Sequence, residues 1–228
     1  KPLVVLVNRL SASASEILAA ALQDYGRAVI VGDSKTHGKG TVQSLMPLDR
    51  GDESLGSLKV TTAGFFRVDG RSTQLKGVSP DIAIRSPSDV MELGEEYLDN
   101  VLPWSWVAPV RYSPAGDLRE VNAYLSDRSE ERLAENETFS VYQEKVDRLE
   151  ERMKRREVSL EWDARLARHM KDRELDKLQD KGMLVMEEDE EEDEEEALSI
   201  LPDRDLVLKE GLHILADLIS YTPPVAQQ

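Results

Sequence analysis

The chain has 228 residues, enough for one large domain or two small ones, and its 45 acidic and 29 basic side chains give a formal net charge of −16. A chain this acidic has no basic surface that could neutralise phosphate groups. Its charge therefore argues against nucleic acid and against an anionic membrane surface as partners. The absence of cysteine excludes disulfides, cysteine nucleophiles and thiolate metal sites.

The first part of the chain predicts a strand, a helix and a second strand. The valine-rich runs LVVLV at 3–7 and AVIV at 28–31 are typical of buried strands. Between them, apolar residues recur with the spacing of one helical face: Ile17, Leu18, Ala21, Leu22 and Tyr25. A short strand–helix–strand unit makes the two strands parallel, so the loops that follow them share one edge of the sheet.

Further strands follow the second of these loops. TVQSLMPL at 41–48 and SLKVTTAGFFRV at 57–68 both have strand character, and Asp69-Gly70 marks a turn after them. GVSPDIAI at 77–84 predicts a turn at its proline and a final short strand. Residues 1–85 are therefore predicted to form part of an α/β domain.

The composition changes from residue 86 onward. Four prolines mark 86–118 as a linker-like segment, in which Trp104 and Trp106 are expected to anchor the chain. Helices are predicted for a C-terminal domain over 119–222, because apolar residues recur at helical spacing within 142–153, 162–170 and 208–219. The acidic run EEDEEEDEEE at 187–196 is predicted to be a disordered, solvated loop, because its like charges repel one another. A calcium site is the weaker alternative, since the run lacks the glycine and the alternating spacing of a calcium loop.

The serine cluster SASASE at 11–16 allows two interpretations. Ser13 and Glu16 have the spacing of a capping box, a common way to begin a helix. Ser13 could instead be a nucleophile, which requires a neighbouring base to take its proton. His37 is the only histidine in the first 160 residues, but no acid is obviously placed to orient it.

Lys39 is the better candidate for the base. It lies between Gly38 and Gly40 in the loop after the second parallel strand, so it can reach the same crevice as Ser13. Close packing around the glycines would exclude water and favour the neutral amine that a base requires. Gln43 could accept a hydrogen bond from the amine, and the N–H of Ala14, at the positive end of the helix dipole, could stabilise an oxyanion.

Three stretches together resemble the C-terminal processing peptidases, or tail-specific proteases, of peptidase family S41: SASASEILAAALQDYGRAVIVG at 11–32, GKGTVQ at 38–43 and GVSPDI at 77–82. The resemblance covers residues 1–85 closely. The later helical part, with NVLPWSWV at 100–107, is similar in a looser way to the C-terminal extension of the long, periplasmic members from Gram-negative bacteria.

The resemblance implies an α/β fold that is half of a Clp protease- or crotonase-like core, followed by the mostly α-helical domain. It implies Ser13 as nucleophile, Lys39 as general base, Gln43 as the residue that orients the lysine, and Ala14 as an oxyanion donor. It further implies a periplasmic endopeptidase that cleaves proteins near their C-termini and requires no cofactor or metal. Its expected partners are unfolded or tagged protein C-termini, a lipoprotein adaptor and a second copy of itself.

Members of the family also carry a PDZ domain and upstream strands with a second oxyanion donor, neither of which this sequence contains. We therefore expect a fragment with little activity of its own. Two alternatives stay open: a non-catalytic interaction or assembly module of a larger protease, and another acyl hydrolase or transferase on a crotonase-type scaffold.

Overall fold

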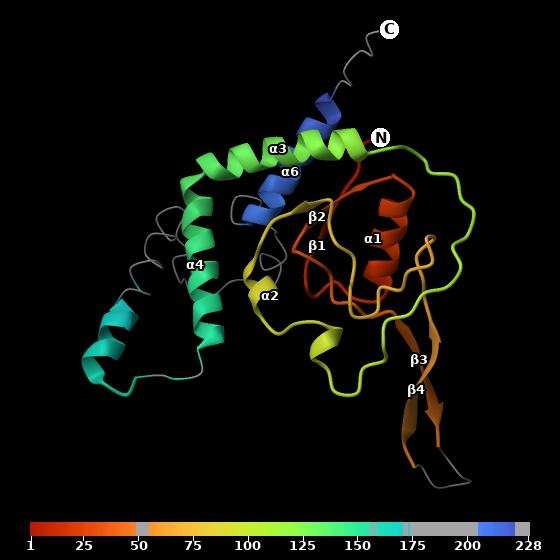
Figure 1. Cartoon of the computed structure of the whole chain (residues 1–228), viewed down its shortest axis with the longest axis horizontal. Coiled ribbons are helices and arrows are strands. Elements are labelled where there is room, and N and C mark those ends of the chain that lie inside the picture. The colour runs from red at the N-terminus through yellow and green to blue at the C-terminus, as the bar shows by residue number, and fades with distance from the viewer. Residues whose placement is uncertain (49–54, 156, 158, 171–172, 174–204, 222–228) are drawn as a thin grey trace, which may run out of the picture. The chain divides into compact units, whose positions relative to one another are not determined.

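A computed structural model describes residues 1–48, 55–155, 157, 159–170, 173 and 205–221 (Figure 1). These residues form two compact units. The first consists of 3–84 and 92–119, and the second of 85–91 and the chain from 120 onward. The mixed α/β unit followed by a helical one confirms the predicted fold class, whereas the domain boundaries at 85 and 118 stay predictions. The acidic run 187–196 lies outside the described residues.

A three-stranded sheet with the order β1-β2-β5 is the centre of the first unit. Its strands are β1 (Val4–Val7), β2 (Val29–Gly32) and β5 (Ile82–Ala83). The predicted parallel pairing is confirmed, with Val4 opposite Val29 in β1 and β2, and β5 runs parallel to β2 on its other side. Every residue of β2 is buried, as its uninterrupted apolar sequence predicts for a central strand.

Helix α1 (Ala14–Asp24) lies beside this sheet (Figure 1). Of the apolar face that the sequence predicts, Leu22 packs against the core, but two large side chains do not. Ile17 and Leu18 are exposed, and the buried side chains of the helix are those of Glu16, Ala19 and Ala20. The two alanines contact a cluster of buried residues in which Val7 and Ile30 take part. Small side chains on this face allow the helix to approach the sheet closely, and this explains the difference.

Two antiparallel strands, β3 (Thr41–Pro47) and β4 (Ser57–Gly64), form a hairpin that extends from the unit in Figure 1. Both strands confirm the predicted ones. A β-bulge interrupts their register between Val42 and Gln43, close to the start of β3. A bulge re-aims the side chains that follow it, so the bulge determines the direction of Gln43.

The segment predicted as linker-like makes specific contacts within the first unit. The indole Nε1 of Trp104 donates to Ser72 O at 2.9 Å, and the Lys76 ammonium lies 3.9 Å from the centre of the Trp104 ring. Ser72 N donates to Ser105 O at 3.1 Å. The side chain of Trp106, in contrast, is exposed. Trp104 therefore provides the predicted anchor. A single 3₁₀ turn, η1 (Glu95–Tyr97), precedes this stretch.

The second unit is helical, as predicted. Its elements include the short α2 (Pro87–Val90), α3 (Arg119–Glu135, of which Arg119 belongs to the first unit), α4 (Glu137–Lys154) and α6 (Leu206–Ser220). Residues 162–170 are helical as well. Buried apolar residues from three helices include Leu125, Val146 and Ile214. The predicted stripe of α6 is only partly correct, because Leu212 and Ile219 are exposed.

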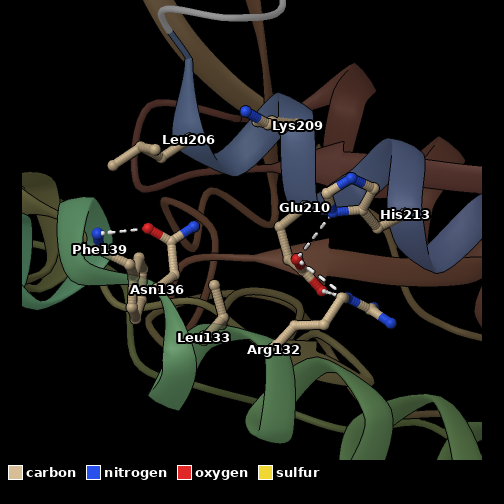
Figure 2. Close-up of a pocket in the computed structure, with 8 residues that line it drawn as sticks. All are labelled: Arg132, Leu133, Asn136, Phe139, Leu206, Lys209, Glu210 and His213. Atoms are coloured by element: carbon tan, nitrogen blue, oxygen red, sulfur yellow. Dashed lines mark hydrogen bonds and ion pairs between the residues drawn. The ribbon is translucent and has the colours of Figure 1, made fainter. Parts of the chain in front are cut away.

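An ion pair between Arg132 of α3 and Glu210 lies on the buried face of α6. Glu210 is 4% exposed, and Arg132 of α3 donates to its Oε1 from Nη2 at 2.7 Å (Figure 2). Arg132 also pairs with Asp217, two helical turns further along α6. Residues of α3, α4 and α6 line a pocket beside this pair: Arg132, Leu133, Asn136, Phe139, Leu206, Lys209, Glu210 and His213. None of the residues predicted for catalysis lines it.

Candidate active site

Ser13 occupies the N-cap position of α1 with an unusual backbone conformation. Its φ is 58° and its ψ is −110°, whereas a capping serine normally has extended dihedrals. A non-glycine residue in this region stores strain of about 1–3 kcal/mol and is held there by its surroundings. The predicted capping box is formed, and in it Ser13 N donates to Glu16 Oε2 at 2.8 Å. Helix capping alone does not require the strained backbone, so the strain is also compatible with the nucleophile interpretation of the serine cluster.

The N–H of Ala14, the first residue of α1, donates no hydrogen bond to any described residue. Such free N–H groups occur in the first turn of a helix because no carbonyl precedes them at the required spacing. They also form the positive end of the helix dipole. Ala14 therefore presents an available donor next to Ser13, as the oxyanion role requires.

The buried carboxylate of Glu16 joins the loop of Ser13 to the loop of Lys39. Its Oε2 accepts from Ser13 N at 2.8 Å and from Lys39 N at 2.9 Å. Its Oε1 accepts from Gly38 N at 2.7 Å. The hydroxyl of Thr36 donates to the same Oε1 at 2.5 Å. One oxygen atom thus lies between the backbone nitrogens of Ser13 and Lys39, and the two loops meet at the sheet edge where the sequence places them.

Lys39 is half-buried, and its Nζ makes no hydrogen bond or ion pair within the described part of the chain. Gly38 before it has a φ of 93°, a conformation that favours glycine. No hydrogen bond between Ser13 Oγ and Lys39 Nζ is present among the described residues. The backbones of the proposed dyad are therefore brought together, while the proton-transfer contact itself stays a prediction.

Gln43 lies on β3, where its Nε2 donates to Thr41 Oγ1 at 2.9 Å and to Thr61 Oγ1 at 3.5 Å. Its carbonyl oxygen has no partner in the described part of the chain. These bonds orient the amide without occupying its acceptor. The predicted bond from Lys39 to this acceptor is not formed in the structure, and the role of Gln43 stays a prediction.

His37 does have an acid beside it, contrary to the expectation from sequence. Glu95 Oε2 lies 3.5 Å from His37 Nε2, and Glu95 N donates to His37 O at 2.9 Å. The two residues are far apart in sequence, so their spacing gave no indication of this pair. His37 N donates to Ser11 O at 2.9 Å, which ties the two loops together a second time.

Arg9 links the loop after β2 to the segment around η1. Its guanidinium is almost fully buried and contacts Glu96 Oε1 at 2.8 Å, and its backbone N–H donates to Asp33 Oδ2 at 2.8 Å. Burial raises the pKa of Glu96, but hydrogen bonds from Lys35 and Arg9 outweigh it and leave that pKa below its ordinary value. The loop between β2 and Lys39 is therefore tied to the segment around η1.

Across the described residues, no group of three or more histidine, aspartate or glutamate side chains could hold a metal ion. Nor is any helix in that part of the chain long and apolar enough to cross a membrane.

The role of Glu16 in joining the two loops was not predicted from the sequence, which placed this residue only in a capping box. Its exact helical spacing from buried Ala19 and Ala20 could have indicated that its side chain points inward.

The sequence matches two family models in succession. Residues 1–84 match peptidase family S41, and residues 88–220 match the C-terminal domain of tail specific protease (DUF3340). Together the two models account for both structural units.

Individual proteins agree with this result. The chain is 41% identical over 177 residues to the tail-specific protease of Haemophilus influenzae, which is 75% of this chain and 25% of that protein. It is 47% identical over 87 residues to the carboxy-terminal-processing protease of Bartonella bacilliformis, which is 38% of this chain and 19% of that protein. The chain thus spans about a quarter or less of the length of these relatives.

A solved structure, titled photosystem II D1 C-terminal processing protease, is 40% identical and covers 37% of this chain and 21% of that chain, with a TM-score of 0.27. The family assignment depends on the sequence matches, which extend over both units, and not on this superposition. The chain belongs to the S41 serine peptidases, as a homologue of the tail-specific proteases that carries their C-terminal domain.

Proposed function

We propose that this chain carries the catalytic serine and lysine of an endopeptidase that cleaves protein substrates near their C-termini through an acyl-enzyme. The observation that supports this most directly is the shared Glu16 carboxylate, which holds Ser13 N and Lys39 N on one oxygen atom. The strained backbone of Ser13 agrees with it, as does the N–H of Ala14, which donates to no described residue.

In the proposed first step, Ser13 Oγ attacks the carbonyl carbon of the scissile peptide while its proton passes to the neutral Lys39 amine. The carbonyl oxygen becomes an oxyanion and accepts a hydrogen bond from Ala14 N–H. The carbon–nitrogen bond then breaks, and the Lys39 ammonium returns its proton to the leaving amine. The products are an ester on Ser13 and a free C-terminal fragment.

In the second step, Lys39 takes a proton from water, which attacks the ester carbonyl and forms a second oxyanion at the same donor. Collapse of this intermediate breaks the bond to Ser13 Oγ, which regains its proton from Lys39. The carbonyl oxygen of Gln43, which has no partner among the described residues, would accept from the amine and aim it, and the bonds of Nε2 to Thr41 and Thr61 support this role.

The test uses a full-length tail-specific protease that contains this sequence and a protein substrate whose C-terminus is degraded. Ser13→Ala and Lys39→Met should each lower kcat by about a thousandfold or more, because each removes a group that takes part in bond formation. Lys59→Ala, at an exposed lysine of β4, is the matched control and should keep full turnover. His37→Gln should keep most of it.

Turnover in Lys39→Met close to that of the native enzyme would overturn the lysine's role. Loss of turnover in His37→Gln together with retention in Lys39→Met would assign the base to histidine instead. Circular dichroism of each variant establishes that the fold is intact.

We further infer substrates with unfolded or tagged C-termini, a periplasmic location and a lipoprotein adaptor, which the resemblance to long tail-specific proteases supports. Cell fractionation tests the location, and recovery with the cytoplasmic fraction would contradict it. A role in assembly is a second candidate for the helical unit, favoured by the exposed Trp162, Leu212 and Ile219. Light scattering should then show a dimer or a complex, and a monomer without a bound adaptor would count against this role.

A further inference from the structure

The loop between β2 and β3, residues 33–40, carries Lys39 and is called the lysine loop below. A turn at residues 72–77 forms hydrogen bonds with this loop on both sides of Lys39. Leu75 N donates to Gly38 O at 2.8 Å, and Gly40 N donates to the side-chain Oε1 of Gln74 at 2.8 Å. Together with Glu16, which accepts from Lys39 N, these bonds fix the backbone immediately before, at and after the proposed base. The turn is therefore the second support of this loop, and its contact after Lys39 is made by a side chain.

The Gln74 amide can adopt only one orientation here. It is 2% exposed, and its Nε2 donates to Glu95 Oε1 at 3.2 Å and to Leu102 O at 3.1 Å. Both of these partners accept hydrogen bonds, so the nitrogen must face them and Oε1 must face Gly40 N. A side chain that only accepts would be repelled by Glu95 and by the carbonyl of Leu102.

The contact between the turn and the lysine loop leaves no free space. A Cβ on Gly40 would lie 2.6 Å from both Gln74 N and Ser72 Oγ. Leu75 has a φ of 65°, which costs a leucine about 1–3 kcal/mol and persists only where the surroundings impose it. The turn is thus held in a strained conformation directly against the residues that flank Lys39.

The support of this turn comes from a stretch that the S41 family model does not cover. That model ends at residue 84, whereas Glu95, Leu102 and Trp104 lie within the match to the tail-specific protease C-terminal domain. Trp104 Nε1 donates to Ser72 O, and its ring lies under the Lys76 ammonium. All of these residues belong to the first structural unit.

We propose that Gln74 is a positioning residue for the Lys39 base, and that the segment from Glu95 to Trp104 holds Gln74 in place. This inference rests on the proposed function, since it assumes that Lys39 takes the proton of Ser13. Gln74 does not contact the reacting atoms. It fixes the peptide after Lys39, and so limits where the amine can lie and how much water reaches it.

The test compares kcat, KM and the pH profile of kcat/KM in a full-length protease that contains this sequence. Gln74→Glu keeps the size of the side chain but places a carboxylate against Glu95. We expect kcat to fall by about 10- to 100-fold with little change in KM, as for a misplaced catalytic group. The pH of half-maximal kcat/KM should rise, because a more hydrated amine keeps its proton more strongly.

A second substitution should rescue the first. In Gln74→Glu/Glu95→Gln the donor and acceptor are exchanged, so the new amide at 95 can donate to the carboxylate at 74. Part of the lost kcat should return, since the carbonyl of Leu102 still faces an acceptor, and the pH profile should move back toward that of the native enzyme. A merely structural defect at position 74 would lower the stability of the chain without shifting the pH profile of kcat/KM.

Gln23→Glu is the matched control. Gln23 is a glutamine that also bridges a carboxylate and a carbonyl, Asp81 Oδ1 at 3.1 Å and Ser79 O at 3.0 Å, but it does not contact the lysine loop. This variant should lose stability and keep the native kcat and pH profile.

Native kcat and pH profile in a folded Gln74→Glu variant would overturn the proposal. If that variant fails to fold, Trp104→Phe decides, since it removes the bond to Ser72 O and keeps an aromatic ring at the position next to Lys76. It should lower kcat several-fold and move the pH profile in the same direction, and an unchanged profile would overturn the proposal. Full turnover in Lys39→Met would instead reject the proposed function itself.

Discussion

At the scale of single residues, a buried carboxylate that takes no part in the proposed reaction holds the two loops of the site together. Glu16 accepts four hydrogen bonds from groups on two loops, and its side chain is completely buried. A buried charge is tolerated only when its lone pairs are satisfied, and here backbone N–H groups and one hydroxyl satisfy them. The position of Ser13 relative to Lys39 therefore depends on a residue that sequence reasoning assigned to helix capping.

Replacing Glu16 by Gln should lower the free energy of unfolding by about 3 kcal/mol, since an amide nitrogen would take the place of one acceptor oxygen and face at least one backbone N–H group. Urea unfolding of this chain measures the effect. Glu92→Gln, at an exposed glutamate of the same unit, should change stability by less than about 0.5 kcal/mol. Equal effects of the two substitutions would show that the four bonds do not stabilise the fold.

At the scale of elements, strands were predicted more reliably than helix faces. The run AVIV is apolar throughout, and β2 is buried on all sides, so no choice between faces arises. In α1 the sequence offers a face of large apolar side chains, yet the structure buries two alanines and a glutamate. Periodicity identifies the more hydrophobic face, but close approach to a sheet selects the face with the smaller side chains.

Two substitutions in α1 distinguish these faces. Ala20→Leu should destabilise the chain by about 1–3 kcal/mol, because extra methylene groups must enter the packed contact with the sheet. Leu18→Ala should cost less than about 0.5 kcal/mol, since Leu18 is 58% exposed. Urea unfolding of both variants is the measurement. The reverse order of effects would mean that the predicted apolar face is the buried one.

The candidate site shows the same limit of sequence reasoning. Ser13, Lys39, Ala14 and Gln43 could be proposed because they follow strands and carry chemistry that a peptidase requires. The supports at Glu95, Leu102 and Trp104 could not, because their contacts with Gln74, Ser72 and His37 join segments that lie far apart in the chain. No local pattern encodes a hydrogen bond between such distant segments.

At the scale of the whole molecule, the two family matches and the two structural units divide the chain differently. Residues 92–119 fall within the match to the C-terminal domain, yet they belong structurally to the first unit. Arg9 of this unit pairs with Glu96, and Gln74 bonds to Glu95 and Leu102. The peptidase part thus includes a stretch that sequence families assign to its neighbour.

Ion pairs and hydrogen bonds to carboxylates also affect how the stability of the fold changes with pH. Hydrogen bonds from Arg119 lower the pKa of Asp117 to about 2, and a hydrogen bond from Lys154 lowers the pKa of Glu150. Carboxylates with lowered pKa values stabilise the fold above their unfolded values and lose this effect as the pH falls. Burial raises the pKa of Asp81, so its contribution has the opposite sign and declines as the pH rises.

Glu96 provides the test of this pH dependence. Its pKa in the folded chain lies below the ordinary value of 4.5, so Glu96→Gln should reduce stability most above about pH 4.5. The difference between the native chain and the variant should shrink as the pH falls below that value, where the native carboxyl takes up its proton. Urea midpoints of both chains between pH 3 and pH 7 measure it. A difference that grows in acid would contradict the assigned ion pairs.

The central claim, that Lys39 draws the proton from Ser13, is tested most directly by the rate at which the acyl-enzyme forms. A full-length protease containing this sequence is mixed with a peptide ester, quenched in acid at short times, digested and mapped by mass spectrometry. We predict an acyl group on Ser13 in the native enzyme, and formation at least about 100-fold slower in Lys39→Met. An acyl group on another residue, or an equal rate in Lys39→Met, would contradict the mechanism.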